Sequence, residues 1–365
     1  MKRLRFVMIG GFLGAGKTTT VGRLAAMYRD RGQRVGIVTN DQASDLVDTS
    51  SLASLGFPVA EVPGACFCCK FDALVDAVDS LSANERPDVI LAEPVGSCTD
   101  LVATVVQALR RHVDAIDVAP FAVVLKPSLA RLALLGESDE NSSRIGYIFR
   151  KQLEEADAIV VNRADELTPM QLASLTELVA ERYPQTPILA GSARTGLGFD
   201  GLFEILGQAG DFGRRVLDID YDRYADAEAA LGWLNTSVRL RAPRPVAIDT
   251  LLCHVVAGID RALQQRGAEA AHVKALALAD GRCAVANLIG TGLGCELSRP
   301  SDHAAHEIEL VVNARVLAEP DTLITVVHGV LGAVAARYHA TLSPGKTSAF
   351  RPSRPVPTHR YDVAL

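Results

Sequence analysis

The sequence predicts an α/β domain built on a mainly parallel sheet, followed by a smaller α+β domain. Its 365 residues predict two domains, at about 100–200 residues per domain. In the first ~210 residues, short apolar runs alternate with helix-like segments, which is typical of layered α/β folds. After Gly210 the pattern changes to half-buried strands and amphipathic helices. Hydrophobic residues make up 48% of the chain, enough for two cores.

The apolar runs of the first region are continuous, not alternating, so we expect parallel strands covered on both faces. These predicted strands are residues 5–9, 34–39, 88–92, 120–125, 157–161 and 187–190. The helices predicted between them are residues 17–31, 70–82, 99–111, 143–155, 168–182 and 200–207. We therefore expect the first domain to span residues 1–212.

The second region predicts a smaller sheet with two helices on one face. Residues 306–317 alternate between apolar and polar side chains, which is typical of a half-buried strand. Residues 248–263 and 323–334 each gather their apolar side chains on one helical face. Further strands are expected near 235–241, 273–279 and 283–289. This domain is expected to span 213–342, and residues 343–365 to form a Pro/Arg-rich tail on the surface.

Composition excludes several classes of protein. A net charge of -6 argues against a general nucleic-acid-binding surface. No apolar stretch reaches the roughly 20 residues needed to span a bilayer. The charged and apolar N-terminus is better interpreted as a strand entering a loop than as a signal peptide. The seven cysteines are odd in number, with three in four positions, which indicates a reduced, cytoplasmic protein.

A phosphate-binding loop is the clearest motif. Residues 11–18 (GFLGAGKT) fit G-x-x-x-x-G-K-[ST] and lie between a predicted strand and a predicted helix. The glycines let backbone N–H groups turn toward a phosphate chain, and the helix N-terminus adds positive charge. Lys17 can reach the β and γ phosphates, and the Thr18 hydroxyl can bind Mg²⁺.

Two later loops favour guanine over adenine. Asn162-Arg163-Ala164-Asp165 follows a strand and is similar to the N-K-x-D element of GTPases, with Arg163 able to stack on a purine. A carboxylate at Asp165 can accept two hydrogen bonds from guanine, which adenine does not offer on that edge. Residues 191–196 include Ser192 and Ala193, in the manner of an S-A-K loop that contacts the guanine carbonyl. The alternative for Asn162 and Asp165 is a plain helix cap or turn.

Glu93 ends the apolar run 88–92, where a carboxylate can hold Mg²⁺ or its water. Gly96, three residues later, can bring its backbone N–H to the γ-phosphate. The alternative is a plain surface acid at the end of a strand.

Cys66, Cys68 and Cys69 form a thiol cluster in a loop that precedes a helix. Thiolates bind soft or borderline metals such as Zn²⁺, Cu⁺ or Co²⁺. Three thiols leave one tetrahedral position open, which suits metal transfer. The alternatives are buried structural cysteines and a redox pair. Cys98, close after Glu93, is a weaker candidate for the same cluster.

Together these motifs resemble the CobW family of P-loop GTPases, relatives of the HypB and UreG metallochaperones. The resemblance lies in residues 10–19 (GGFLGAGKTT), 64–69 (GACFCC), 92–96 (AEPVG) and 162–165 (NRAD), and it covers about 1–210. It implies GTP hydrolysis coupled to the handling of Zn²⁺, Co²⁺ or Ni²⁺, or to cobalamin metabolism.

Carried onto this sequence, the resemblance implies a role for each motif residue. The nucleotide with its Mg²⁺ would be bound by Gly11, Gly14, Ala15, Gly16, Lys17, Thr18, Thr19, Gly96, Asn162, Arg163, Asp165, Ser192 and Ala193. Lys17, Glu93 and Asp41 would be catalytic, Thr18 and Glu93 would hold Mg²⁺, and the three thiols would hold the delivered metal. Asn40-Asp41 resembles the start of the family's first switch segment, which would respond to the nucleotide, and Asp48 lies where the family usually has an acid. The sequence departs from the family pattern at Ser44, Lys126 and Arg163, and it has no His-rich loop.

The leading hypothesis is a GTP-hydrolysing metallochaperone or insertase, slow without its partner. Its ligands would be GTP, Mg²⁺ and a transition metal, Zn²⁺ before Co²⁺ or Ni²⁺. Its partner would be a client metalloprotein or a cobalamin-dependent enzyme, and a nucleotide-dependent homodimer is a further expectation. Two alternatives stay open. One is an accessory GTPase of cobalamin metabolism with regulatory thiols, and the other is a P-loop small-molecule kinase.

Overall fold

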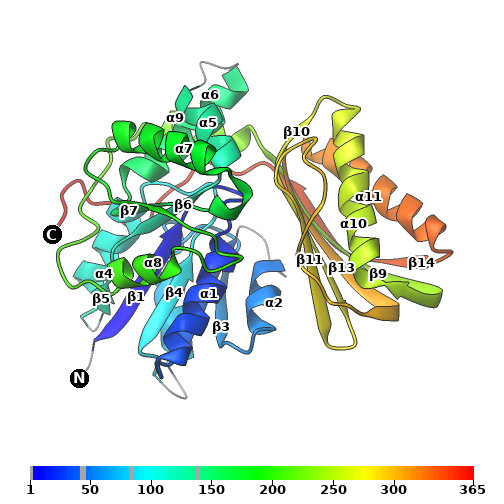
Figure 1. Ribbon diagram of the computed structural model, residues 1–365, viewed down its shortest axis with the longest axis horizontal. Helices are drawn as coiled ribbons and strands as arrows, with labels where there is room; N and C mark the ends of the chain where they lie inside the picture. The colour runs from blue at the N-terminus through cyan, green and yellow to red at the C-terminus, as the bar shows by residue number, and fades with distance from the viewer. Residues whose placement is uncertain (1–2, 42–46, 83–85, 115, 136–139) are drawn as a thin grey trace. The chain divides into compact units, whose positions relative to one another are not determined.

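A computed structural model describes residues 3–41, 47–82, 86–114, 116–135 and 140–365 (Figure 1). Its contacts divide the chain into two compact units. The first unit holds Met1–Ser44, Leu55–Ala227 and Arg354–Leu365. The second unit holds Asp45–Ser54 and Glu228–Ser353. The domain bounds expected from the sequence stay a prediction.

The first unit is built on a parallel sheet of eight strands, in the order β3-β2-β4-β1-β6-β7-β8, with β5 also paired to β1. The strands are β1 (Leu4–Gly10), β2 (Val35–Asp41), β3 (Val59–Pro63), β4 (Val89–Glu93), β5 (Ile116–Val118), β6 (Ala122–Leu125), β7 (Ala158–Val161) and β8 (Ile188–Ala190). Every residue of β4, β6 and β7 is buried, which explains their continuous apolar runs. The predicted fold class is confirmed. Strands β3 and β5 were not predicted.

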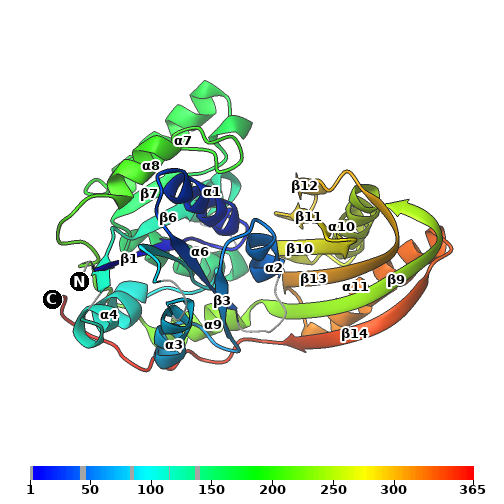
Figure 2. The same ribbon diagram turned by 90° about the horizontal axis from the view of Figure 1, so that it is seen from below.

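Helices cover both faces of this sheet, with α1, α7 and α8 on one face and α3 and α4 on the other (Figure 2). The helices are α1 (Lys17–Asp30), α3 (Phe71–Leu81), α4 (Gln107–His112), α5 (Pro127–Leu135), α6 (Glu140–Glu154), α7 (Pro169–Arg182), α8 (Phe199–Leu206) and α9 (Tyr221–Ala229), with a 3₁₀ turn at Ala164–Glu166. One difference from expectation lies at 99–111, where a π-helical segment, Val102–Val106, precedes α4. Its buried β-branched side chains pack poorly in a regular α-helix, so a wider turn is tolerated there.

The second unit is a six-stranded antiparallel sheet in the order β12-β11-β10-β13-β9-β14. Its strands are β9 (Gly232–Ala247), β10 (Glu269–Ala279), β11 (Arg282–Leu288), β12 (Glu296–Arg299), β13 (Ala304–Leu317) and β14 (Thr341–Phe350). Helices α10 (Ile248–Gln264) and α11 (Pro320–Arg337) bury their apolar faces in its core, as predicted. A short helix, α2 (Val47–Ala53), also belongs to this unit.

The segment expected to begin a surface tail at 343 instead starts within strand β14, which pairs with β9 at the edge of the second sheet. Proline is tolerated on an edge strand because its missing N–H faces solvent, and the register shifts between Pro344 and Thr347. From Arg354 onward the chain belongs to the first unit. We call residues 354–365 the C-terminal strap.

Among the described residues, no helix combines the length and apolarity that crossing a membrane requires.

Candidate nucleotide and metal site

Four neighbouring strands of the first sheet carry the candidate residues at their carboxyl ends. The phosphate loop follows β1 and Glu93 ends β4, while Asn40 lies at the end of β2 and the thiol loop follows β3. In sheet order these strands are β3-β2-β4-β1. Because parallel strands end at one edge, motifs far apart in sequence meet there, which is where open α/β sheets bind ligands.

The backbone of the phosphate loop adopts positive φ angles at its glycines. Gly16 has φ +95°, and a Cβ there would lie 2.4 Å from Nδ2 of Asn162. No other residue type meets both conditions. Helix α1 begins at Lys17, whose side chain is buried and whose Nζ lies 3.5 Å from the carbonyl oxygen of Phe12. A buried ammonium and a helix N-terminus therefore lie at one loop.

Glu93 and Thr18 lie side by side because β1 and β4 are adjacent. The Thr18 hydroxyl donates to Oε1 of Glu93 at 2.9 Å, and Glu93 is 6% exposed. A hydroxyl beside a carboxylate is an oxygen pair that suits Mg²⁺. Gly96 is close to both motifs, since a Cβ on it would lie 2.9 Å from Nζ of Lys17. Its backbone can therefore approach the phosphate loop.

Asn162 joins the phosphate loop to the loop at 191–196. Its Nδ2 donates to the Ala15 carbonyl at 2.7 Å, and its Oδ1 accepts from the Ala193 N–H at 2.9 Å. Its side chain is thus engaged with protein backbone. Sequence reasoning, which assigned it to the base, missed this role, because the bonds cross 147 and 31 residues.

Asp165, the residue expected to select guanine, has a lowered pKa and stays ionised. Burial opposes ionisation, but hydrogen bonds from Ser192 and Arg194, and the charge of Arg194, outweigh it and lower the pKa of Asp165. An ionised carboxylate can accept two hydrogen bonds from guanine. Arg163 has φ +61° and its Nη1 lies 3.0 Å from Oε1 of Glu166. In this structure it therefore forms an ion pair, and the expected stacking on a purine stays a prediction.

The thiol loop brings three sulfurs together. Sγ of Cys66 lies 3.1 Å from Sγ of Cys68 and 3.4 Å from Sγ of Cys69, and the last two are 3.7 Å apart. Cys66 and Cys68 are buried, and Cys69 is partly exposed. Four sulfurs around zinc at about 2.3 Å are separated by similar distances, so this donor set fits a thiolate-bound metal.

Hydrogen bonds among the thiols shift the pKa of each cysteine in the cluster. Hydrogen bonds with the thiols of Cys68, Cys69 and Cys98 hold the pKa of Cys66 well below the usual range. The same hydrogen bond to Cys66, reinforced by burial, raises the pKa of Cys68. Hydrogen bonding to Cys66 also raises the pKa of Cys69, to about 11. A metal would therefore displace protons from the thiols as it binds.

Asn40 fixes the thiol loop from the neighbouring strand. Its Nδ2 donates to the carbonyls of Val62 (2.8 Å) and Ala65 (2.7 Å), and its Oδ1 accepts from the Phe67 N–H at 2.8 Å. The sequence placed Asn40 only at the start of a switch segment. The structure adds that the same residue holds the loop that carries the thiols.

The C-terminal strap lies across the same loop. The Thr358 N–H donates to the Cys68 carbonyl at 2.8 Å, and its hydroxyl donates to the Cys69 carbonyl at 3.1 Å. The Val356 N–H hydrogen-bonds to the Cys69 thiol. Figure 2 shows the strap (red) passing α3 and α4. Nothing in the sequence pairs residues 290 positions apart, so the strap was not predicted as part of the site.

The remaining candidates are placed as follows. Gly11 and Gly14 have positive φ, Ala15 is buried and Thr19 is exposed. The backbone of Asp41 ends β2, but the side chains of Asp41 and Asp48 and all of Ser44 lie outside the described residues. Lys126 is buried.

A phosphate loop at the edge of a parallel sheet, with a hydroxyl–carboxylate pair beside it, defines a P-loop nucleotide-binding domain, here with a thiol cluster in the loop that follows β3. The family model "CobW/HypB/UreG, nucleotide-binding domain" matches residues 5–190. The chain belongs to this family, as the sequence resemblance predicted.

Two curated relatives are similar to this chain. Over 168 residues it is 32% identical to the zinc chaperone YeiR of Escherichia coli (strain K12), covering 44% of this chain and 47% of the relative. Over 203 residues it is 28% identical to the zinc chaperone CobW of a Sinorhizobium species, covering 50% and 57%. The chain thus spans about half the length of the curated relatives it matches.

Solved structures of similar chains include HypB from Helicobacter pylori in complex with nickel, with a TM-score of 0.40 and 16% identity over 58% of this chain and 93% of that one. They also include Zn(II)-bound YjiA GTPase from E. coli, with a TM-score of 0.40 and 16% identity over 86% and 95%.

Proposed function

We propose that this protein is a GTP-hydrolysing metallochaperone that binds Zn²⁺ at Cys66, Cys68 and Cys69 and delivers it to a client protein. The observation that carries the proposal is the group of three sulfurs 3.1–3.7 Å apart, in the loop after β3, the strand next but one to the Glu93 strand. The zinc chaperones among its relatives support zinc over cobalt or nickel.

The nucleotide end of the mechanism rests on charge and positioning. Lys17 and the N–H groups of the loop would neutralise the β and γ phosphates, and the Gly96 N–H would approach the γ-phosphate. Thr18 and Glu93 would hold Mg²⁺, which supplies electrostatic stabilisation of the developing phosphate charge. Asp165 would select guanine. Asn162 would keep the phosphate and base loops in register.

The metal is cargo in this proposal. Each thiol must lose its proton to bind, so zinc affinity rises with pH. Cys69 is the most accessible of the three sulfurs and is the natural first contact for incoming or departing metal. Asn40 connects the thiol loop to the end of β2, directly before the segment expected to respond to nucleotide.

The test measures zinc affinity of the reduced protein against a competing chelator, with GDP and with a non-hydrolysable GTP analogue. We expect the two affinities to differ by about 5–150-fold, the usual range of coupling between sites. The Cys66→Ala/Cys68→Ala double variant should lose zinc binding and keep nucleotide binding. Equal zinc affinity in both nucleotide states would contradict the proposal, as would no zinc binding by the unaltered protein.

Base selection is tested on Asp165. The Asp165→Asn variant replaces one acceptor with a donor, so we expect guanine nucleotide affinity to fall at least about 10-fold and xanthine nucleotide affinity to rise. The control is Glu181→Gln, which removes an exposed carboxylate of α7 and should leave both affinities unchanged. Tight ATP binding by the unaltered protein would instead favour a kinase.

A further inference from the structure

A fourth cysteine lies beside the cluster of Cys66, Cys68 and Cys69. Cys98 is five residues beyond Glu93, on the segment that leaves β4, and it is 1% exposed. Its thiol hydrogen-bonds to the thiols of Cys66 and Cys68. A buried cysteine that only fills a core packs its sulfur against carbon atoms. This one meets two sulfurs of a different loop, so its surroundings are those of a metal ligand.

The backbone around Cys98 is fixed by buried polar groups. Nε2 of Gln152 donates to the carbonyls of Gly96 (3.0 Å) and Cys98 (2.8 Å). The next residue, Thr99, donates through its hydroxyl to Oε1 of Glu155 at 3.1 Å, and Oε2 of Glu155 accepts from the Val102 N–H at 2.9 Å. Glu155 thus holds both Thr99 and the first residue of the π-helical segment. These bonds fix the backbone directly after Cys98.

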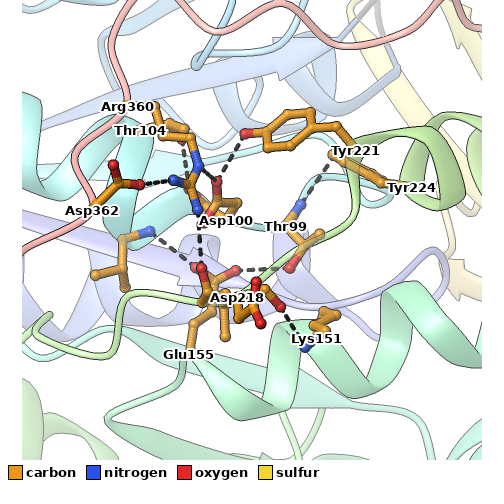
Figure 3. Close-up of polar contacts among 12 residues, drawn as sticks. Thr99, Asp100, Thr104, Lys151, Glu155, Asp218, Tyr221, Tyr224, Arg360 and Asp362 are labelled. Carbon is orange, nitrogen blue, oxygen red and sulfur yellow. Dashed lines mark hydrogen bonds and ion pairs between the residues drawn. The ribbon is translucent and has the colours of Figure 1, made fainter.

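Asp100 anchors the same segment to the strap and to α9 (Figure 3). Its φ is +62°, and its carboxylate accepts from the Tyr221 hydroxyl and from Nε of Arg360, each at 2.8 Å. The Thr99 N–H donates to the Tyr224 hydroxyl at 3.2 Å. Helix α6, helix α9 and the strap therefore all hold the segment that carries Cys98. A metal ligand needs its backbone fixed in this way.

We propose that Cys98 is the fourth sulfur ligand of the zinc, completing a tetrahedral site with Cys66, Cys68 and Cys69. This assignment rests on the proposed function. Cys66 and Cys68 form the shared centre of the site, Cys69 closes it from the solvent side, and Cys98 closes it from the interior. Four thiolates satisfy the coordination that zinc prefers.

The position of Cys98 gives the nucleotide a direct route to the metal. Glu93, Gly96 and Cys98 lie on one continuous segment, and Gly96 touches the phosphate loop. A shift of that segment during the nucleotide cycle withdraws one sulfur from four. The three that remain leave an open position, where a client's ligand can enter. Cargo release is then a change in coordination number.

The first measurement counts sulfurs by X-ray absorption at the zinc edge of the unaltered, zinc-loaded protein. We expect four sulfurs at about 2.3 Å. Three sulfurs would overturn the proposal and still leave the proposed function intact, whereas a protein that binds no zinc contradicts the function itself. Because this measurement uses the unaltered protein, its result does not depend on whether a variant folds.

The second measurement compares Cys98→Ala and Cys98→Ser with Cys69→Ala after cobalt substitution. Each variant should lose about a quarter of the sulfur-to-cobalt charge-transfer intensity, because one of four thiolates is gone. Zinc affinity should fall by more than about 100-fold, beyond the loss typical of a group that only orients a ligand. The control is Cys283→Ala, a buried cysteine of the second unit, which should bind metal normally. Intensity and affinity that are unchanged in the Cys98 variants but reduced in Cys69→Ala would overturn the proposal.

Discussion

Glu155 is a fully buried carboxyl group whose protonation affects stability. Burial, reinforced by the charge of Asp100, raises its pKa from 4.5 to about 8, against the opposing hydrogen bonds from Val102 and Thr99. Between these two pH values the folded protein binds more protons than the unfolded chain. The free energy of unfolding therefore falls as pH rises through this window, by a few kcal/mol at its upper end.

The Glu155→Gln variant should remove this pH dependence. Glutamine keeps the size and can still accept from the Val102 N–H, but it cannot ionise. We expect unfolding free energies close to wild type near about pH 5 and a gain over wild type that grows toward about pH 8.5. Urea unfolding across this range checks it. The control is Glu154→Gln, a partly exposed neighbour, and parallel pH profiles for the two variants would refute the assignment.

At the scale of single residues, the sequence predicts motifs of consecutive residues better than it predicts the distant residues that hold those motifs in place. The phosphate loop and the thiol cluster lie within eight and four consecutive residues, so spacing alone carries their chemistry. Asn40 and Asn162 support those sites through hydrogen bonds to backbone 22–27 and 31–147 residues away. A side chain's partner at that separation depends on how the strands pair. Periodicity does not contain that information.

Among the elements, the C-terminal strap contributes an ion pair to the interior of the first unit. The Asp100 side chain is fully buried, and Arg360 is its cationic partner at 2.8 Å. Burial raises the pKa of Asp100 despite the hydrogen bond from Tyr221 and the charge of Arg360. Removing one partner of a buried pair is costly because the other charge is left uncompensated.

We therefore expect Arg360→Met to lower the free energy of unfolding by about 3 kcal/mol. Arg354→Met is the control, since Arg354 pairs with Asp222 at an exposed position and should cost less than about 1 kcal/mol. Chemical unfolding measures both. The double variant Asp100→Asn/Arg360→Met should recover part of the loss. Equal losses in the two single arginine variants would show that the strap does not depend on this pair.

The strands that sequence reasoning missed are short or lie at the edge of a sheet. Strands β3, β5 and β12 contain three to five residues and lack a long apolar run, so they form only where a neighbour offers free backbone groups. Strand β14 was missed because Pro344 and Lys346 suggest a surface tail. Both residues are acceptable on an edge strand. By contrast, the long buried strands and most of the helices were predicted from their patterns, whereas the shorter helices α2, α5 and α9 were not.

Over the whole chain, the connectivity links the candidate sites to both units. The segment after Asn40 continues into α2, which belongs to the second unit, and the chain returns to the first unit at Leu55. The second unit then ends at Ser353, and the strap that follows contacts the thiol loop. The chain thus leaves the second unit twice, at Leu55 and at Arg354. The first segment leads through β3 into the thiol loop, and the second is the strap that contacts this loop.

Coupling between metal and nucleotide must be reciprocal. If a GTP analogue changes zinc affinity by a given factor relative to GDP, zinc must change the ratio of analogue to GDP affinity by the same factor. We expect this factor to lie between about 5 and 150 in the unaltered protein. In Cys98→Ala it should fall toward one, because the nucleotide-facing segment then carries no ligand. Calorimetric titrations of each nucleotide, with and without saturating zinc, measure the effect of zinc on nucleotide affinity, which is then compared with the effect of nucleotide on zinc affinity. A full factor retained in Cys98→Ala would show that the coupling runs through Asn40 and the thiol loop alone.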